Sequence, residues 1–418
     1  MEYLPRIADL VLAENLSALG AVVIEGVRGC GKTETARQRA RSEVRLDVDL
    51  NAARLAEIDP LLILDGDTPR LIDEWQRVPR IWDAVRRAVD DRHARGQFIL
   101  TGSATPDDSV ERHPGVGRFA VIGMRTMTLA EKQATTPTVS VRALLAGESV
   151  TPAMSELTLA DYLNHIVVGG WPELVGASEA TARRFLSGYL ATTIERDLPE
   201  VSGARRNPVL VRRFLHAYAQ QTAQPTTLKT LAAHAAGLPD DADPGTMSRS
   251  SAASYRDALT RMRIVDDLPA WEPPARATRR FTTTPKRHLA DPALAANLLG
   301  LNSNGLRQDL TTAGLLFESL VVHDLRAYAD ACDAWTLHYR APNSREEIDC
   351  VIETATGDWT GFEVKLGTAD SIDEAVRKLK HIEGGMRRPA KNLVVVTATG
   401  VVESRNGVQI VPLGALGA

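Results

Sequence analysis

The sequence has few of the features that mark secreted, disulfide-stabilised or membrane proteins. Its three cysteines, Cys30, Cys332 and Cys350, have neither metal-ligand spacing nor a paired framework. No run of about eighteen apolar residues occurs, so the sequence predicts no transmembrane helix. The first residues lack a positively charged segment followed by an apolar core. We therefore expect a cytoplasmic protein with no membrane partner.

The sequence also has a small net charge and few aromatic residues. The net charge is −4, which excludes a global field that draws the protein to nucleic acid, so any such binding must be local. Aromatic residues make up 5% of the chain, and no stacking platform for single strands is obvious. The remaining composition, 44% hydrophobic and 24% charged, is typical of globular proteins. A length of 418 residues predicts two or three domains.

A glycine-rich run is the strongest signal that is present. The sequence Gly26-Val27-Arg28-Gly29-Cys30-Gly31-Lys32-Thr33 matches the pattern G-x-x-x-x-G-K-[ST] between an apolar strand, 21–24, and a helix-forming segment, 32–41. In that setting backbone N–H groups cradle phosphates, Lys32 reaches the β and γ oxygens, and Thr33 binds Mg²⁺. The sequence therefore predicts an ATP site with Mg²⁺, formed by Gly26, Gly29, Cys30, Gly31, Lys32 and Thr33.

An acidic pair ends the next strand-like run, Leu71-Ile72-Asp73-Glu74. We expect Asp73 to hold the Mg²⁺ shell. Glu74 lies where a carboxylate orients or deprotonates the attacking water, a task that needs a fixed anion. Acidic pairs also end ordinary strands, but the position downstream of a complete phosphate loop favours the catalytic interpretation.

Hydroxyl side chains follow the strand-like run 97–100. Nucleotides bind at the carboxyl ends of strands in open α/β sheets, so Thr101 or Ser103 is expected to contact the γ-phosphate or the catalytic water, with Ser103 favoured. The alternative is a hydroxyl that caps a helix.

An arginine follows the glycines of the run 115–117. Arg118 is a candidate arginine finger, which would couple hydrolysis to assembly and require neighbouring subunits in a homo-oligomer. Arg112 and Arg125 are competitors, and a plain surface role is the alternative.

The periodicity of the chain indicates three regions. Residues from about 20 to 130 alternate short apolar runs with helical stretches, such as 79–95, which is typical of a parallel α/β sheet. Hydroxyls and prolines with weak periodicity mark a boundary between residues 135 and 158. Amphipathic helices are expected at 181–194 and 208–221. We expect domains at 1–135, 136–290 and 291–418.

The middle region has the order of a winged helix. Helical patterns at 226–237 and 248–262 precede the strand-like run 264–271. Basic residues exceed acidic ones between residues 201 and 290, and Lys286 and Arg287 belong to that excess. Ser248 to Ser251 lie at the start of the candidate recognition helix, so this region predicts contact with DNA. Packing between domains is an equal alternative.

The last third of the chain carries a second group of charged residues. Residues 346–352 and 361–366 alternate as the two strands of a hairpin, which directs Phe362, Val364 and Leu366 to one face and Glu363 and Lys365 to the other. Asp349 can lie opposite that pair, and a helix at 315–328 can bring Glu318 beside them. Carboxylates with a lysine suit metal-assisted phosphodiester hydrolysis. A charged outer face of the hairpin is the alternative. A helix at 372–383 and a strand at 392–396 complete a β-β-α-β order, which supports the chemical interpretation.

Taken in order, these elements resemble a widespread bacterial and archaeal ATPase family that pairs an N-terminal AAA-type ATPase domain with a C-terminal domain related to PD-(D/E)xK nucleases. The resemblance implies an α/β protein with AAA-type strand order, a winged-helix segment, a restriction-endonuclease-like C-terminal domain and nucleic acid as partner. Glu318, Asp349, Glu363 and Lys365 match the nuclease motif. The residues that carry it are 26–33, 71–74, 100–103, 169–172, 195–197, 316–318 and 346–365.

Three functional hypotheses follow from these residues. The leading one is a Mg²⁺-dependent ATPase in which Lys32, Thr33 and Asp73 hold MgATP, and whose nucleotide state controls a DNA-directed C-terminal half. The second is an ATP-gated, metal-dependent nuclease. The third is an ATP-dependent signalling switch that does not bind nucleic acid.

Overall fold

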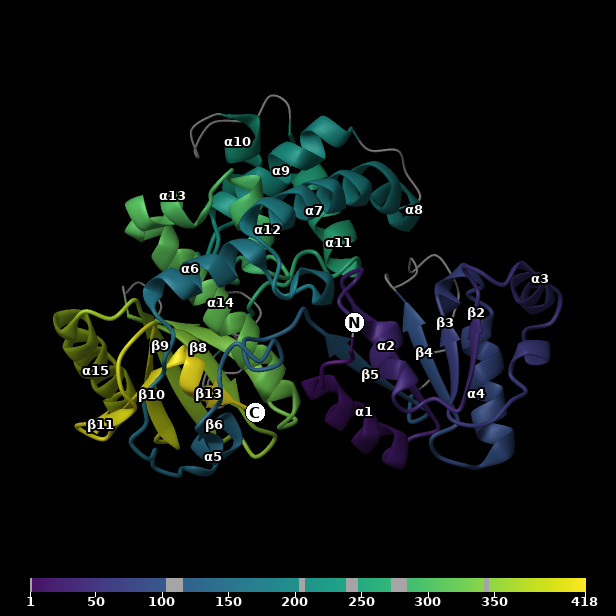
Figure 1. Cartoon of the computed structure of the whole chain (residues 1–418), viewed down its shortest axis with the longest axis horizontal. Coiled ribbons are helices and arrows are strands. Elements are labelled where there is room, and N and C mark those ends of the chain that lie inside the picture. Colours follow the sequence, from purple (N-terminus) through teal and green to yellow (C-terminus); the bar gives the residue numbers. More distant parts are fainter. Residues whose placement is uncertain (1, 103–115, 203–206, 238–246, 272–283, 342–345) are drawn as a thin grey trace. The chain divides into compact units, whose positions relative to one another are not determined.

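The chain folds into two compact units, shown in the computed structural model of Figure 1. The structure describes residues 2–102, 116–202, 207–237, 247–271, 284–341 and 346–418. Unit 1 contains Met1–Thr126, Arg196–Arg205 and Asp257–Ile264. Unit 2 contains Met127–Glu195, Arg206–Arg256 and Val265–Ala418.

The core of unit 1 is a five-stranded parallel sheet. Its order is β2-β3-β4-β1-β5, so β1 lies between β4 and β5. The central strands are continuous apolar runs because both faces of a parallel sheet are covered. The strands are β1 (Ala21–Gly26), β2 (Ser42–Arg45), β3 (Arg70–Asp73), β4 (Phe98–Gly102) and β5 (Phe119–Met124).

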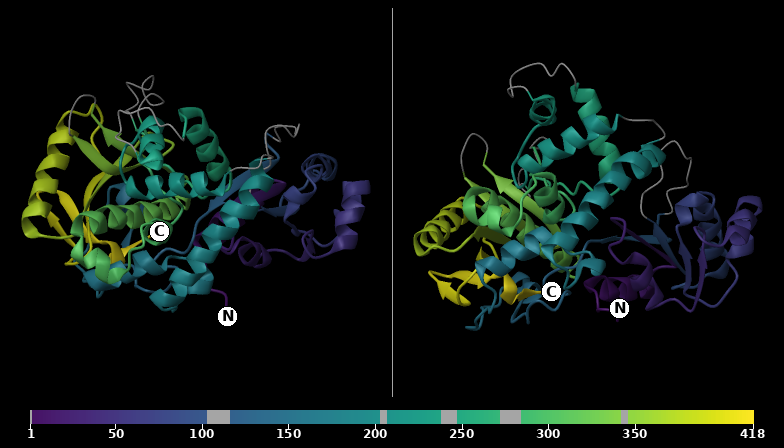
Figure 2. Two further views of the ribbon diagram at one scale, coloured as in Figure 1. Left: turned by 90° about the horizontal axis from the view of Figure 1, so that it is seen from above. Right: turned by 45° about the horizontal axis from the view of Figure 1, so that its top comes forward.

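Helices cover both faces of this sheet (Figures 1 and 2). One face packs against α3 (Leu50–Ile58) and α4 (Ile81–Arg92), in a core that contains Val23, Ile72 and Leu100. The other face is covered by α1 (Ile7–Ala18) and α2 (Lys32–Arg37), which both contact β1. Helix α2 ends before the expected Arg41. The short helix α8 (Leu198–Ser202) also belongs to this unit.

A six-stranded mixed sheet forms the core of unit 2. Its order is β11-β12-β10-β9-β8-β7, and β8 and β9 form the predicted antiparallel hairpin. Helix α15 packs on one face, while α14 and α5 contact the other (Figure 1). The elements are β7 (Trp335–Arg340), β8 (Glu347–Glu353), β9 (Trp359–Lys365), β10 (Asn392–Thr397), β11 (Glu403–Arg405), β12 (Val408–Pro412), α5 (Val141–Ala146), α14 (Leu310–Asp330) and α15 (Ala369–Gly384).

The remaining helices of unit 2 lie mainly in the middle of the chain. Apolar residues at helical spacing bury one side of each, as Phe214 and Leu215 do in α9. After α11 the chain forms isolated bridges, Val265 with Leu289 and Leu268 with Lys286. These helices are α6 (Leu159–Val168), α7 (Glu179–Thr192), α9 (Pro208–Gln220), α10 (Leu228–Ala236), α11 (Arg249–Arg261), α12 (Pro292–Leu298) and α13 (Ser303–Gln308). The end of α11, from Asp257 on, belongs to unit 1.

The region expected as an unpatterned boundary contains regular structure. Strand β6 (Val139–Ser140) pairs in parallel with β13 (Leu416–Gly417). The amide of Asn392 donates to the backbone oxygens of Leu144 and Glu148, at 2.9 and 3.0 Å. Residues 139–148 therefore form a small two-stranded sheet with the end of the chain and contact the six-stranded sheet through Asn392. Local sequence patterns could not reveal this, because the partners lie far along the chain.

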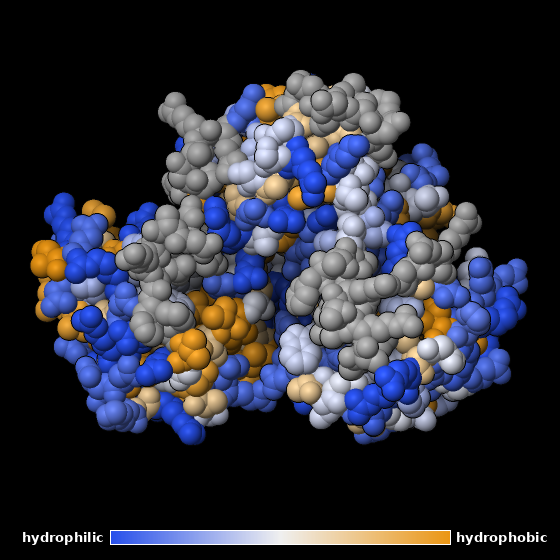
Figure 3. All heavy atoms as spheres, turned by 180° about the vertical axis from the view of Figure 1, so that it is seen from behind, coloured by the Kyte–Doolittle hydropathy of each residue, from blue (hydrophilic) through white to orange (hydrophobic). Residues whose placement is uncertain are grey.

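Hydrophilic residues cover most of the face drawn in Figure 3, and hydrophobic residues gather there in a few separate areas. Within the described part of the chain, none of the helices combines the length and apolar character needed to cross a bilayer.

Candidate functional site

The glycine-rich run forms the loop between β1 and α2. Gly31 has a φ of 107°, a backbone conformation that side chains with a Cβ rarely adopt. At Gly26, which ends β1, an added Cβ would lie 2.2 Å from the backbone oxygen of Met124. Cys30 is buried inside the loop. Two of the glycines are thus required by backbone geometry.

Lys32 is folded back onto this loop. Its Nζ donates hydrogen bonds to the backbone oxygens of Gly26 and Val27, both at 2.9 Å. The side chain is buried at the start of α2. The ammonium group is therefore held at the phosphate-binding loop itself.

Asp73 connects the loop to the neighbouring strands. Its Oδ1 accepts hydrogen bonds from the hydroxyl of Thr33, at 3.0 Å, and from that of Thr101, at 2.6 Å. Asp73 ends β3 and pairs in register with Thr101 on β4. Three predicted residues from the loop and two strands meet at the carboxyl edge of the sheet. Their hydroxyl and carboxylate oxygens are the hard ligands that Mg²⁺ prefers, so these residues fit the expected ion.

Glu74 directly follows this strand in a left-handed backbone conformation, with a φ of 56°. The amide of Gln76 donates a hydrogen bond to its Oε2. The sequence missed Arg45, which ends β2 and whose Nε lies 3.8 Å from Asp73 Oδ2. Arg45 belongs to no motif, because a charged residue at the end of a short strand is common.

The expected arginine finger lies at the other edge of the sheet. Arg118 precedes β5, which runs parallel to β1, so it lies at the amino ends of these strands and is ion-paired with Asp90 at 2.8 Å. Arg125 follows β5, at the carboxyl edge that carries the phosphate loop. The structure therefore does not bring Arg118 to the loop. Ser103 and Arg112 lie outside the described residues.

Two ion pairs join the phosphate-loop region to distant parts of the sequence. Arg28, inside the loop, donates to Asp197 Oδ1 at 2.9 Å. Glu25, next to the loop, is ion-paired with Arg263. All four residues belong to unit 1. Asp197 lies in the run 195–197 that supported the resemblance, whereas no pattern marked Arg263.

The four predicted nuclease residues gather in unit 2. We call Glu318 of α14, Asp349 of β8 and Glu363 of β9 the acidic centre. A residue from outside the predicted set lies among them, because the Nζ of Lys286 is 2.7 Å from Glu318 Oε1 and 2.8 Å from Asp349 Oδ1. Lys286 is 1% exposed. It had been expected on a basic surface that contacts DNA, and that expectation is wrong for this residue.

The third carboxylate is also paired with lysines. Glu363 Oε1 accepts from Lys365 and Lys378, both at 2.7 Å. Glu363 is 0% exposed, which excludes the alternative of a charged outer face for this residue. Its Oε2 is buried and has no hydrogen-bond partner among the described residues. Both faces of this sheet are covered by helices, which strict strand alternation does not reveal.

Burial and the neighbouring lysines shift the pKa values of the buried carboxyl groups in opposite directions. Burial raises the pKa of Glu318 to about 8, with the nearby Asp349 adding to the increase. Burial would also raise the pKa of Asp349, but Lys286, Lys365 and Lys378 outweigh it and lower the value to about 2. For Lys286, burial is outweighed by Asp349 and Glu318, so its pKa is raised. Lys286 is therefore an ammonium ion and Asp349 a carboxylate at neutral pH.

The acidic centre does not fit a divalent cation in this arrangement. A metal ion between Glu318 and Asp349 would need the oxygens that Lys286 occupies. The other oxygen of Asp349 accepts the backbone N–H of Val364 at 2.9 Å. In the described ranges of the chain, no three histidine, cysteine, aspartate or glutamate side chains form a metal-binding group.

Part of the basic middle region is also buried. Arg287 is ion-paired with Asp267 and 2% exposed, so it too is unavailable to DNA, contrary to the expectation. The basic residues that remain exposed on α9, α10 and α11 are Arg212, Arg213, Lys229 and Arg249.

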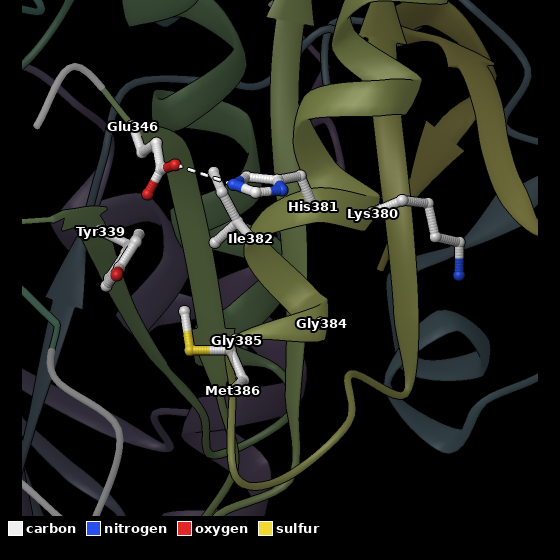
Figure 4. A pocket seen from close by; sticks show the side chains of 8 residues that line it. All are labelled: Tyr339, Glu346, Lys380, His381, Ile382, Gly384, Gly385 and Met386. Carbon is white, nitrogen blue, oxygen red and sulfur yellow. Dashed lines mark hydrogen bonds and ion pairs between the residues drawn. The ribbon is translucent and has the colours of Figure 1, made fainter.

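A separate cavity of about 590 Å³ lies in unit 2 at the end of α15, beside β7. Figure 4 shows His381 turned toward Glu346, with Lys380 pointing away from both. His381 Nε2 and Glu346 Oε1 are 3.0 Å apart. None of the residues in the predicted site lines this cavity.

Comparison with known proteins divides the chain into three matched segments. Residues 19–132 match the model of an AAA domain. Residues 159–305 match a domain of unknown function (DUF8612), and residues 313–416 match another (DUF4143).

Two curated relatives are similar over most of the chain. One uncharacterized protein of Mycobacterium bovis and one of Mycobacterium tuberculosis are each 27% identical over 381 residues, which is 89% of this chain and 76% of each relative.

A solved structure, the Aeropyrum pernix ORC1 protein in complex with DNA, shares 13% identity and covers 75% of this chain and 94% of its own. Its TM-score of 0.27 is too low to establish fold or function. The phosphate loop, Asp73 and Thr101 all fall within the segment 19–132. The chain thus carries an AAA domain at its N-terminal end and a C-terminal domain of unknown function (DUF4143), and the segment between them matches the model of another domain of unknown function.

Proposed function

We propose that the protein is a Mg²⁺-dependent ATPase whose nucleotide state controls a DNA-directed C-terminal half. One observation carries the ATPase part: Asp73 Oδ1 accepts the hydroxyls of both Thr33 and Thr101 at the carboxyl edge of a parallel sheet. This edge is where nucleotides bind in open α/β sheets. The match of residues 19–132 to an AAA domain supports the same conclusion.

The chemistry is divided among the residues of this edge. Loop N–H groups bind the phosphates, and Lys32 exchanges its two backbone partners for β and γ oxygens. When bound, Mg²⁺ would be held by Thr33 and Asp73 and would neutralise charge on the phosphates. Glu74 accepts a proton from, or orients, the attacking water, and the hydrogen bond from Gln76 fixes its carboxylate.

The direction of β5 bears on which arginine could assist phosphoryl transfer. Arg125 follows β5 at the carboxyl edge, on the side of the phosphate loop, whereas Arg118 lies at the amino edge. We therefore favour Arg125 over Arg118 for a contact within one chain. Arg118 serves as a finger only in an oligomer, where it would act on a neighbouring subunit.

Two contacts support control of other parts of the chain by nucleotide. Arg28 of the loop binds Asp197, and Glu25 beside the loop binds Arg263. Asp197 follows α7, and Arg263 follows α11, so both are continuous with helices that belong partly or wholly to unit 2. A phosphate that draws Arg28 away from Asp197 changes the constraint on the chain after α7.

The ATPase part is tested with Lys32→Ala and Glu74→Gln in the full chain. We expect Lys32→Ala to lose ATP binding, and Glu74→Gln to bind ATP but not hydrolyse it. Turnover should disappear with EDTA and return with Mg²⁺. Arg118→Ala in dilute, monomeric protein is the matched control and should keep turnover. Normal hydrolysis by both folded variants would overturn the assignment.

The DNA part rests on the exposed Arg212, Arg213, Lys229 and Arg249. We expect salt-sensitive binding of duplex DNA that changes with ATP, and weaker binding when Arg212 and Arg213 are both changed to alanine. The matched control is Arg183→Ala together with Arg184→Ala on α7. Absence of DNA binding, with self-association that depends on ATP, would favour the signalling switch instead.

A further inference from the structure

Lys286 takes the position between two carboxylates that a divalent cation occupies in metal sites. Its Nζ lies at nearly equal distances, 2.7 and 2.8 Å, from one oxygen of Glu318 and one of Asp349. These carboxylates come from α14 and β8, elements distant in sequence. An ammonium ion and a metal ion cannot share this position, because both need the same two oxygens.

Two other oxygens of the acidic centre also have partners in this chain, whereas the buried Oε2 of Glu363 has none among the described residues. Lys365 and Lys378 both donate to Glu363 Oε1, and the backbone N–H of Val364 donates to Asp349 Oδ2. Three carboxyl groups thus meet three lysines of the same chain. A buried carboxylate with a hydrogen-bonded counter-ion does not need an external cation.

The backbone fixes Lys286 in this place. Its N–H donates to the backbone oxygen of Leu268 at 3.1 Å, and its own backbone oxygen accepts from Leu268 N–H at 2.9 Å. It also forms a bridge with Pro225. The next residue, Arg287, is ion-paired with Asp267 and bonded to the backbone oxygen of Thr226 at 2.7 Å. The position of Lys286 is therefore fixed by its own backbone hydrogen bonds and by the contacts of Arg287.

We propose that Lys286 is a built-in replacement for the metal ion of a nuclease-like centre. The centre does not bind a divalent cation and does not cleave phosphodiesters; it fastens the segment around Lys286 to α14 and β8. The nuclease chemistry implied by Glu318, Asp349, Glu363 and Lys365 is thereby silenced by one residue outside that motif. This proposal does not depend on ATP hydrolysis.

The test is Mn²⁺ binding to the nucleotide-free full chain, measured by calorimetry and by the electron paramagnetic resonance signal of free Mn²⁺. We expect no saturable site in the wild type that depends on Asp349. Lys286→Ala should gain one Mn²⁺ site, at least about tenfold tighter than any site of the wild type, because it leaves two buried carboxyl groups without the ammonium ion between them. Lys286→Ala with Asp349→Asn should lose that site again.

Lys378→Met is the matched control, since it removes a lysine from the same centre but not from the bridging position. It should gain no site. A wild-type Mn²⁺ site or DNA cleavage that Asp349→Asn abolishes would overturn the proposal, and these two arms remain decisive if Lys286→Ala does not fold. A folded Lys286→Ala protein that gains no Mn²⁺ site would also refute it.

Discussion

Asp73 and Asp349 show how the surroundings of a buried aspartate determine its role. Each lies in a strand, and each is 4% exposed. Asp73 accepts the hydroxyls of Thr33 and Thr101 on Oδ1 and has Arg45 at 3.8 Å from Oδ2, whereas Asp349 Oδ1 lies 2.8 Å from the ammonium group of Lys286. Neutral hydroxyls leave the negative charge of an aspartate available to a metal ion, whereas the positive charge of a lysine neutralises it. We therefore propose different roles for two equally buried aspartates, nucleotide chemistry for Asp73 in unit 1 and structural stability for Asp349 in unit 2.

The largest expected effect comes from removing the counter-ion in unit 2. Lys286→Met leaves Glu318 and Asp349 buried without their shared partner, so we expect the free energy of unfolding to fall by about 3–5 kcal/mol. Chemical denaturation measures this. Lys378→Met, whose side chain is partly exposed, should cost about 1 kcal/mol or less. Equal losses in the two variants would contradict the special position of Lys286.

The two aspartates should respond differently in an ATPase assay. Asp73→Asn removes a negative charge from the proposed Mg²⁺ site, and we expect turnover to fall about 100-fold or more. Asp349→Asn should leave turnover unchanged while it lowers stability. The contrast between the two aspartates fails if Asp349→Asn abolishes hydrolysis in protein that is still folded.

Acid should remove the contribution of Asp349 to the free energy of unfolding. Its pKa is lowered to about 2 by Lys286 and the other lysines, against an ordinary value of 3.8. The folded state therefore binds fewer protons than the unfolded state between these values, and the stabilisation is complete above pH 4 and is lost as the pH falls toward 2. The stability difference between the wild type and Asp349→Asn should narrow over this range. A difference that is constant from pH 5 to pH 2 would count against the ion pair.

The smallest expected effect concerns the second hydroxyl on Asp73. Thr101→Val keeps the shape of the side chain but removes one hydrogen bond to Asp73 Oδ1. A hydrogen bond of this kind contributes about 0.5–1.5 kcal/mol, so turnover should fall by about tenfold at most. Steady-state kinetics with saturating Mg²⁺ would detect this. A loss as large as that of Asp73→Asn would instead make Thr101 a direct ligand of the reacting groups.

The sequence predicted local elements well and their ion-pair partners poorly. The phosphate loop, β8, β9 and helices such as α9 follow from glycine pattern and periodicity. The meeting of Glu318, Asp349 and Glu363 was also expected. Lys286 was not, because its partners lie 32 and 63 residues away and nothing near it in the sequence marks a buried lysine. The domain limits at residues 135 and 290, and the role of Ser103, stay predictions.

The pairing of β6 with β13 also governs when unit 2 can complete its structure. Residues 139–148 have hydrogen-bond partners between 189 and 278 residues further along the chain. During synthesis from the N-terminus, this segment leaves the ribosome long before the strands that bind it. Its apolar side chains, among them Val141 and Leu144, cannot be buried in the native structure until most of the chain has been made. Folding during synthesis therefore includes an interval in which residues 139–148 have been made but their native partners have not.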